Sequence, residues 1–293
     1  MRATEEEQRR PKNFDVVCAG EALWKLATPT GPSAKGLPSM RLRPGGGAVD
    51  VALALARAGL RVGLATVLTD DKFGRARVEE LAESGVDVGG VAHSRPRSGF
   101  VLVDARGGAN QVAADVEEQP PLEVPDSWTS ELLLLSGLSP VVSHAAALCK
   151  TARAARRRGT LVLLDFNASL HLWAGRDPRT IRMVLREVDA ARCSLADLAV
   201  VGLDVDMLRP LLRQSAVLVV SDGAGGAVAR GPFGEVAFAP PAANLRRASG
   251  PGDSVAAALC VELTRPGEVG ESPGARWHRA LRRGYTRSPG PWA

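Results

Sequence analysis

The sequence predicts an α/β fold whose mostly parallel central sheet is covered by helices on both faces. Short apolar runs of about strand length recur at 14–19, 62–68, 132–136, 161–165 and 217–221. Longer Ala/Arg/Leu stretches of helical character lie between them, at 48–58, 75–84, 143–158 and 179–188. Alternation of this kind requires right-handed crossovers between parallel strands, with the sheet buried on both faces.

Length and composition favour one main domain of an ordinary globular protein. The chain has 293 residues, of which 45% are hydrophobic and 24% charged, within the usual range for such proteins. Residues 1–13 are polar with mixed charges, so we expect a disordered tail before a domain that spans 14–293. No run of 18 apolar residues occurs, and we therefore expect no membrane-spanning segment.

Two stretches interrupt the alternation of strands and helices. Residues 28–44 are rich in Pro and Gly, and residues 93–116 contain two segments of β character. Ligands of open α/β sheets bind beyond the carboxyl ends of the strands. The two stretches therefore predict a small β lid that closes over a substrate at that edge.

Charge and cysteine usage narrow the classes of partner. The formal charge is +5, mainly from scattered Arg, with one run at 153–158 that we interpret as a solvated helix face that attracts anions. We expect no nucleic-acid partner from this distribution. Four widely spaced Cys without nearby His indicate neither a zinc site nor a disulfide framework, which fits a cytoplasmic protein.

The sharpest local motif is Ser-Gly-Pro-Gly-Asp at 249–253, directly before an apolar helical run at 254–263. Glycines let the backbone approach a ligand closely, and the free N–H groups at a helix start favour anions. The carboxylate of Asp253 could accept a proton from a bound hydroxyl during phosphoryl transfer. The structural alternative is a Pro-Gly turn with Asp253 as an ordinary N-cap.

A second motif, Gly45-Gly46-Gly47, leads into a helical stretch that contains Asp50. It resembles part of a dinucleotide-binding fingerprint, but Asp50 stands at the third glycine position and no hydrophobic strand precedes the loop. A dinucleotide-dependent oxidoreductase is therefore disfavoured. A glycine loop facing a polar ligand and a purely structural turn both remain open.

Two further strand ends carry polar residues and glycine. The strand predicted at 217–221 ends at Ser221. The loop after it contains Gly223 and Gly226 and has room for a phosphate or a base. Asn167 lies just after the strand at 161–165, where helix capping is an equally good explanation.

The order and spacing of these motifs from Phe14 to about Leu263 resemble the PfkB family of carbohydrate kinases, with the fructokinase-like branch closest. The matching segments read VVCAGEAL, PGGGAVDVALALARAGL, VLTDDKFGRARVEELAESGVD, LDFNASLHLW, VVSDGAGGA and SGPGD. The resemblance implies a ribokinase-like three-layer sandwich with a small β lid. It also implies ATP and Mg²⁺ as cosubstrates, and transfer of the γ-phosphoryl group to a sugar hydroxyl.

The resemblance also implies roles for individual residues, carried over position by position. Asp253 matches the general base, and Gly250 and Gly252 match the anion hole. The sugar-facing positions are Lys25, Gly46, Gly47, Asp50 and Asn167; the nucleotide positions are Ser194, Ser221, Gly223 and Gly226; and the metal position is Asp197. Lid strands of this family can pair between subunits, so a homodimer through the lid is one alternative.

Several of these positions depart from the family pattern. Lys25 replaces an acid that accepts hydrogen bonds from sugar hydroxyls, and Asp50 replaces an Asn; one hypothesis is that these two residues pair. Pro251 replaces an Ala and has no N–H to donate to the anion hole. The other departures are Ser169 for an Arg, Arg247 for an acid linked to cation activation, and Ser194 and Asp197 for the N-x-x-E pair.

The carboxyl-terminal stretch 282–293 is rich in Pro, Gly and Arg, and we expect coil there instead of the family's closing helix. Together these departures leave two hypotheses. The first is an active ATP-dependent sugar kinase that uses Asp253 as general base. The second is a catalytically impaired relative that binds nucleotide or sugar without turnover.

Overall fold

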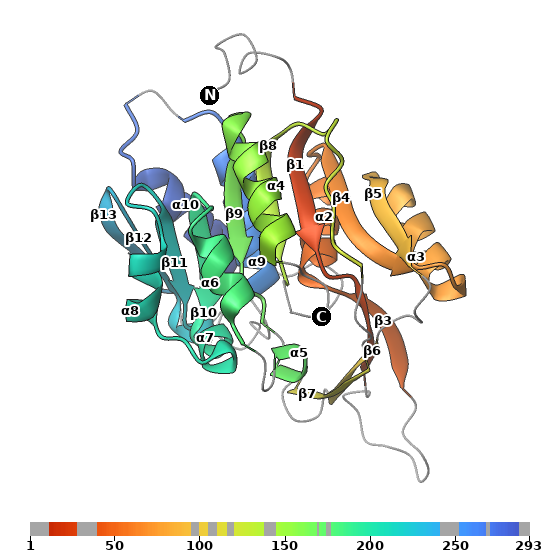
Figure 1. Cartoon of the computed structure of the whole chain (residues 1–293). Coiled ribbons are helices and arrows are strands. Elements are labelled where there is room, and N and C mark those ends of the chain that lie inside the picture. The colour runs from red at the N-terminus through yellow and green to blue at the C-terminus, as the bar shows by residue number, and fades with distance from the viewer. Residues whose placement is uncertain are drawn as a thin grey trace.

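The computed structural model describes residues 12–27, 40–94, 100–104, 110–115, 120–137, 145–168, 170–173, 177–240, 252–267 and 270–286. These residues form two sheets and the helices around them (Figure 1). The predicted α/β class with a mostly parallel sheet is confirmed.

The large sheet has nine strands, and the five strands predicted from the sequence are all among them. Its order is β13 (Gly234–Phe238), β12 (Ala227–Gly231), β11 (Val217–Ser221), β10 (Ala190–Ser194), β9 (Leu161–Asp165), β8 (Ser130–Ser136), β1 (Phe14–Gly20), β4 (Val62–Thr69) and β5 (Val86–Ser94). Every neighbouring pair is parallel except β11–β12 and β12–β13, which form an antiparallel extension at one edge.

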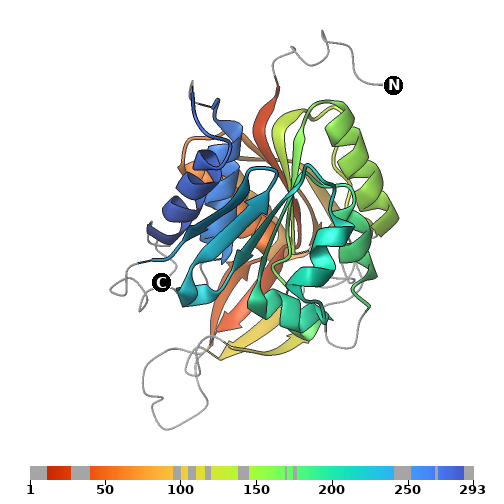
Figure 2. The same cartoon turned by 90° about the vertical axis from the view of Figure 1, so that its left-hand side faces the viewer.

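Helices cover both faces of this sheet, so the fold has three layers (Figure 2). One face carries α4 (Ala145–Arg157), α6 (Arg179–Leu185), α7 (Leu195–Val201) and α8 (Val205–Leu208); the other carries α2 (Gly47–Arg57), α3 (Lys72–Glu83), α9 (Gly252–Thr264) and α10 (Ala275–Thr286). Successive strand residues point to opposite faces, so Val17 and Ala19 pack on the α4 side, and Val16 and Cys18 on the α9 side. Short helical turns lie at α5 (Leu170–Trp173), η2 (Arg209–Leu211) and η3 (Gly223–Gly225).

The small sheet has the order β3 (Arg41–Gly45), β2 (Leu23–Ala27), β6 (Phe100–Asp104) and β7 (Asn110–Asp115). It lies below the large sheet in Figure 1, on the side where β1 ends. Parts of the two stretches predicted as a lid therefore form strands. Strand β2 was not predicted, and residues 28–39, 95–99 and 105–109 lie outside the described residues.

The end of the described chain differs from the sequence prediction. Helix α10 continues through Thr286, so the expectation of coil from residue 282 onward is wrong for its first five residues. The Pro and Gly of the last residues dominated that expectation, whereas Trp277, Ala280, Leu281 and Gly284 form an apolar face buried against α9 and β13. Residues 287–293 lie outside the described residues.

The structure also bears on the cysteines, on membrane spans and on the predicted tail. All four Cys are buried and free, as expected. None of the helices described is long and apolar enough to cross a membrane. Of the predicted tail, residues 1–11 lie outside the described residues, but Asn13 donates its backbone N–H to Thr129 (3.1 Å) and Lys12 binds the Gly159 carbonyl (3.0 Å).

Candidate active site

Four neighbouring strands bring a row of residues together at the carboxyl edge of the large sheet. In the register of the sheet Gly20 of β1 pairs with Ser136 of β8, Ser136 with Asp165 of β9, and Asp165 with Arg192 of β10. Residues paired in this way lie side by side on the same face of the sheet. The row is thus set by backbone pairing, before any side chain makes a contact.

Asp253 lies in the first turn of α9, next to this row. Its Oδ1 accepts a hydrogen bond from Asn167 Nδ2 at 3.0 Å. Asn167 has φ of 37°, a left-handed conformation that Asn adopts more readily than most residues, and it follows directly from the end of β9. The structure therefore brings together two residues that the sequence placed 86 positions apart.

The surroundings of Asp253 change its acidity. Burial, followed by the nearby Asp50 carboxylate, raises the pKa of Asp253 to about 7, although Lys25 and Arg192 act in the opposite direction. A carboxyl group with this pKa can accept a proton near neutral pH, which an ordinary Asp does far less readily.

The glycine loop at the start of α2 contacts the same residues. Gly46 has φ of 114°, and a Cβ at this position would overlap the Glu21 carbonyl. A Cβ at Gly47 would overlap the Asn167 amide and the Ser136 hydroxyl. Because Gly46 and Gly47 have no side chain, the backbone of the loop can approach Asn167 closely.

Lys25 and Asp50 form an ion pair, as hypothesised from the sequence. The Lys25 Nζ donates to Asp50 Oδ2 at 3.3 Å, and both side chains are partly exposed. Lys25 lies on β2 of the small sheet and Asp50 in the first turn of α2. The pair therefore connects the small sheet to the glycine loop.

Arg192 is the centre of a buried ionic network that the sequence analysis did not identify. It is 3% exposed; its Nη1 donates to Asp165 Oδ1 (3.0 Å) and its Nη2 to Ser221 Oγ (2.8 Å). Asp165 also accepts from Ser136 Oγ at 3.3 Å. Burial lowers the pKa of Arg192, but Asp165 and Asp197 outweigh burial and raise it, so the guanidinium stays charged.

Ser194 and Asp197 form the N-terminal cap of α7. Ser194 Oγ accepts from the Asp197 N–H (3.0 Å), while Asp197 Oδ2 accepts from Ser194 N (2.7 Å) and Ser194 Oγ (2.7 Å). Asp197 Oδ1 accepts from Ala168 N at 2.8 Å, and Arg192 Nη1 lies 3.8 Å from Oδ2. The carboxylate thus already has partners on both oxygens.

These contacts do not fit the magnesium ligand that the resemblance implies at Asp197. Magnesium requires carboxylate oxygens that are open to it, with room for several water molecules. Asp197 is 8% exposed and faces a guanidinium. In the part of the chain that the structure describes, no three His, Cys, Asp or Glu side chains are grouped so as to hold a metal ion.

The predicted nucleotide loop follows β11. Gly223 begins the short helical turn η3, and Gly226, with φ of 104°, lies so close to the Phe238 carbonyl that a Cβ would overlap it. Tyr285 Oη of α10 donates to the Gly226 carbonyl at 2.6 Å, and the Tyr285 ring lies 5.9 Å from that of Phe238. The closing helix that the sequence analysis did not expect therefore contacts this loop.

The sequence-predicted residues thus fall into two groups. Asp253, Gly252, Asn167, Gly46, Gly47, Asp50, Lys25, Ser194, Asp197, Ser221, Gly223 and Gly226 are placed by the fold at or beside the carboxyl edge of the large sheet. Gly250 lies outside the described residues, as do Ser169, Arg247 and Pro251. The sequence analysis missed Arg192, Ser136 and Tyr285. Of these, only Arg192 could have been noticed, because it is a lone Arg between small apolar residues.

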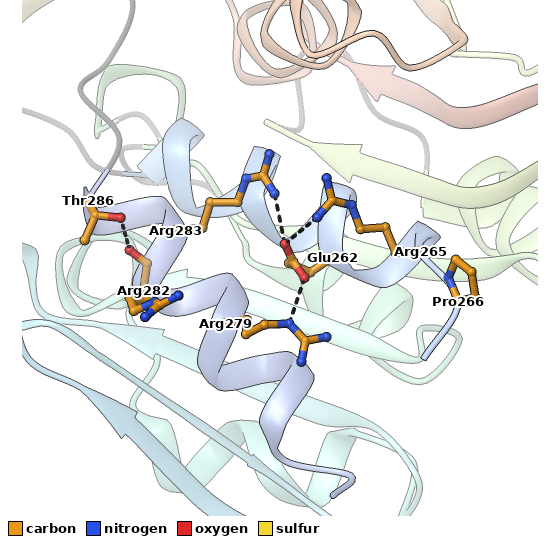
Figure 3. Close-up of a pocket in the computed structure, with 7 residues that line it drawn as sticks. All are labelled: Glu262, Arg265, Pro266, Arg279, Arg282, Arg283 and Thr286. Carbon is orange, nitrogen blue, oxygen red and sulfur yellow. Dashed lines mark hydrogen bonds and ion pairs between the residues drawn. The ribbon is translucent and has the colours of Figure 1, made fainter. Parts of the chain in front are cut away.

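A separate cavity of about 350 Å³ lies at the other end of α9 (Figure 3). There the 4%-exposed Glu262 accepts hydrogen bonds from Arg265 (3.4 Å), Arg279 (3.2 Å) and Arg283 (3.0 Å). The arginines come from α10 and from the residue just after α9, so this network joins the two helices.

Comparisons with known proteins identify the family of this fold. The profile of the pfkB family carbohydrate kinases matches residues 13–286. The 5-dehydro-2-deoxygluconokinase of Shouchella clausii is 24% identical over 288 residues, which cover 89% of this chain and 86% of that protein.

Solved structures show the same fold at low sequence identity. A fructokinase with bound ATP from Xylella fastidiosa is 18% identical with a TM-score of 0.71, over 92% of both chains. The aminoimidazole riboside kinase of Salmonella enterica, in complex with aminoimidazole riboside and an ATP analogue, is 22% identical with a TM-score of 0.70, also over 92% of both chains.

Proposed function

Because the chain belongs to the pfkB family of carbohydrate kinases, we propose that it transfers the γ-phosphoryl group of ATP to a hydroxyl of a small sugar, with Asp253 as general base. The observation that carries this proposal is the position of Asp253. Its carboxyl group lies in the first turn of α9 and is held by Asn167, and burial and Asp50 raise its pKa to about 7.

Each group has a definite part in this mechanism. Asp253 accepts the proton of the attacking hydroxyl as the new bond to phosphorus forms. The N–H groups at the start of α9 face the transferring phosphoryl group and stabilise its negative charge. The contacts of Asp197 do not fit a metal ion held by the protein.

The nucleotide is proposed to bind along the end of β11. The Gly223–Gly226 turn supplies backbone donors there, and Tyr285 fixes the turn from α10. The buried Ser221 hydroxyl at the end of β11 accepts from Arg192 and so supports this edge from inside the protein. The relatives whose structures contain ATP or an ATP analogue support ATP as the phosphoryl donor.

The acceptor is proposed to lie between the glycine loop and the Lys25–Asp50 pair. Where the family pattern has an acid and an Asn, this chain has Lys25 and Asp50, so the net charge of the two positions is one unit more positive. An added ammonium group favours an acceptor that carries a carboxylate, and the Shouchella clausii relative is named for a sugar acid. Sugar acids therefore belong beside neutral hexoses among the substrates to test.

The second candidate is a binding protein without turnover. The observation that favours it is the Lys25–Asp50 ion pair, because the two groups satisfy one another before any sugar arrives. An acceptor would have to replace that contact with its own hydrogen bonds.

The deciding experiment measures ATP consumption with magnesium present against free hexoses, pentoses, keto-deoxy sugar acids and nucleosides, with Asp253→Asn as the blank. Turnover above the blank with one acceptor supports the kinase and identifies its substrate class. Equal rates for both proteins with every acceptor, in folded samples that bind ATP, would support the binding protein.

A further inference from the structure

Arg192 lies directly behind the start of α9, where the transferred phosphoryl group is proposed to sit. A Cβ on Gly252 would lie 3.1 Å from Arg192 Nη1 and 3.3 Å from Nη2. The guanidinium therefore lies beside the first residue of α9, next to the space that a side chain at position 252 would take. Gly252 permits this approach because it has no side chain.

Arg192 pairs with two carboxylates, and the charge of one of them, Asp165, acts on a third, Asp253. Asp165 is fully buried, Asp197 is 8% exposed, and Asp253 is half-buried; Arg192 contacts the first two. Without a cation, this group would repel the triphosphate of ATP strongly, since like charges at short range in a poorly hydrated site interact strongly. Some positive charge must balance them.

We propose that the Arg192 guanidinium is the resident cation of this site, in the place where a magnesium ion bound to protein carboxylates would otherwise lie. Asp165 and Asp197 are the two carboxylates available to such an ion, and Arg192 already occupies both. Any metal that takes part then arrives with the nucleotide and has no ligand from these two side chains.

The position of Arg192 is fixed by its partners on the two neighbouring strands. Asp165 on β9 and Ser221 on β11 bind its two terminal nitrogens from either side of β10. A guanidinium held in this way keeps its charge and its direction, whereas a bound metal ion exchanges with solvent. Arg192 is thus a positioning residue that acts through the backbone of α9 and through the charge of Asp165.

The inference rests on the proposed function only for its effect on catalysis; its main prediction concerns metal binding and needs no turnover. Mn²⁺ binding is measured by electron paramagnetic resonance on the folded protein without nucleotide. The wild-type protein is expected to bind no Mn²⁺ at this site up to about 1 mM, whereas Arg192→Met leaves Asp165 and Asp197 without their cation and is expected to bind Mn²⁺ there at least about tenfold more tightly.

Two variants make the test specific. Arg192→Lys keeps a charge between the carboxylates and is expected to stay free of Mn²⁺. Because Lys and Met fill a similar space, a purely steric role of Arg192 would give the same result for both variants. Arg213→Met removes a half-exposed arginine that pairs with Asp189, and is expected to behave like the wild-type protein. In the kinase assay, free Mg²⁺ beyond that bound to ATP should not stimulate the wild-type protein but should stimulate Arg192→Met.

One result overturns the inference even if Arg192→Met does not fold. In that result the wild-type protein binds one Mn²⁺ without nucleotide, and the Asp197→Asn variant does not bind it. If the kinase assay is silent with every acceptor, the Mn²⁺ measurement still decides whether the guanidinium excludes the metal.

Discussion

The carboxyl group of Asp253 is surrounded by groups that act on its charge in opposite directions. Burial and Asp50 favour its neutral form, while Lys25 and Arg192 favour the anion. Because burial and the Asp50 charge have the larger effect, the pKa of Asp253 rises to about 7. At neutral pH the group is thus divided between a form that can accept a proton and one that cannot.

The pH dependence of turnover follows from this pKa. Below pH 7 Asp253 gains a proton, so kcat/KM is expected to fall by about tenfold per pH unit. The measurement is the rate between pH 5 and 9 with the preferred acceptor. Asp253→Asn should lose about 10²-fold or more in rate and keep its affinity for ATP, and a wild-type rate that does not vary across this range would contradict the assignment.

The same shift has a consequence for stability. Since the folded-state pKa of Asp253 is raised above its unfolded value of 3.8, its contribution to stability is fully present below pH 3.8 and is lost as pH rises through about 7. Asp253→Asn removes the penalty of a buried charge, so its melting temperature relative to the wild type should increase from pH 5 to pH 8. Thermal unfolding at both pH values checks this; a difference that shrinks with pH would contradict it.

Gly47 offers a second test at the scale of one residue. Gly47→Ala places a methyl group where the Asn167 amide lies, so Asn167 must move away from Asp253. We expect kcat to fall by about tenfold or more, a loss of about 1.4 kcal/mol in transition-state stabilisation. The control is Gly267→Ala, whose methyl group would meet, among the described residues, only Glu271 at 3.8 Å and should leave kcat unchanged. Equal rates for both variants would show that Asn167 does not position the base.

At the scale of elements, the two ends of α9 make different contacts. Its first turn carries Asp253, while Glu262 near its last turn accepts hydrogen bonds from three arginines (Figure 3). Arg276 of α10 also donates to the carbonyls of Glu262 (2.8 Å) and Leu263 (3.0 Å), which lie at the end of α9. The apolar contact along the helix is close, since a Cβ on Gly284 of α10 would lie 2.8 Å from Val255 Cα. The position of Asp253 therefore depends on α10.

Removal of the Glu262 charge tests this connection. Glu262→Gln leaves three arginines around a neutral side chain, and we expect a loss of about 2–3 kcal/mol in the free energy of unfolding, since the arginines retain some access to water. The control Glu235→Gln breaks an exposed pair with Arg230 and should cost less than about 1 kcal/mol. Urea unfolding of the three proteins gives these values, and similar losses for both variants would contradict a structural role for Glu262.

At the scale of the whole molecule, most of the large sheet could be predicted from the sequence. Strands buried on both faces appear as continuous apolar runs, and the five runs found in this way are all strands. The strand β10 was missed because its sequence, AARCS, has a central Arg and no β-branched residue.

The candidate site was less accessible to sequence reasoning, because its contacts join distant parts of the chain. The Lys25–Asp50 pair could be hypothesised because both residues departed from one motif pattern, and it is confirmed at 3.3 Å. Arg192 could not be assigned partners, because Asp165 and Ser221 come from two other strands whose register the sequence does not give. Helix α10 was misjudged because the Pro and Gly that follow it outweighed its apolar face.

Binding of nucleotide should be visible in the stability of the whole chain. An ATP analogue at 100 times its dissociation constant adds about 2.7 kcal/mol to the free energy of unfolding, or about 4 °C in melting temperature for a chain of this size. Asp253→Asn should show the same shift, because it changes the base and not the proposed nucleotide loop. The absence of any shift in the wild-type protein would contradict ATP binding, whichever of the two functions holds.

The order of the strands also determines when, during synthesis, the chain contains all the residues of the candidate site. Strand β1 is made first, yet it lies between β8 and β4, and α9 is made after the whole row from Gly20 to Arg192. Domains that depend on such distant pairings fold late and slowly. A nascent chain on the ribosome contains Arg192 and its carboxylates before it possesses Asp253, so no partly made product can consume ATP through the proposed base.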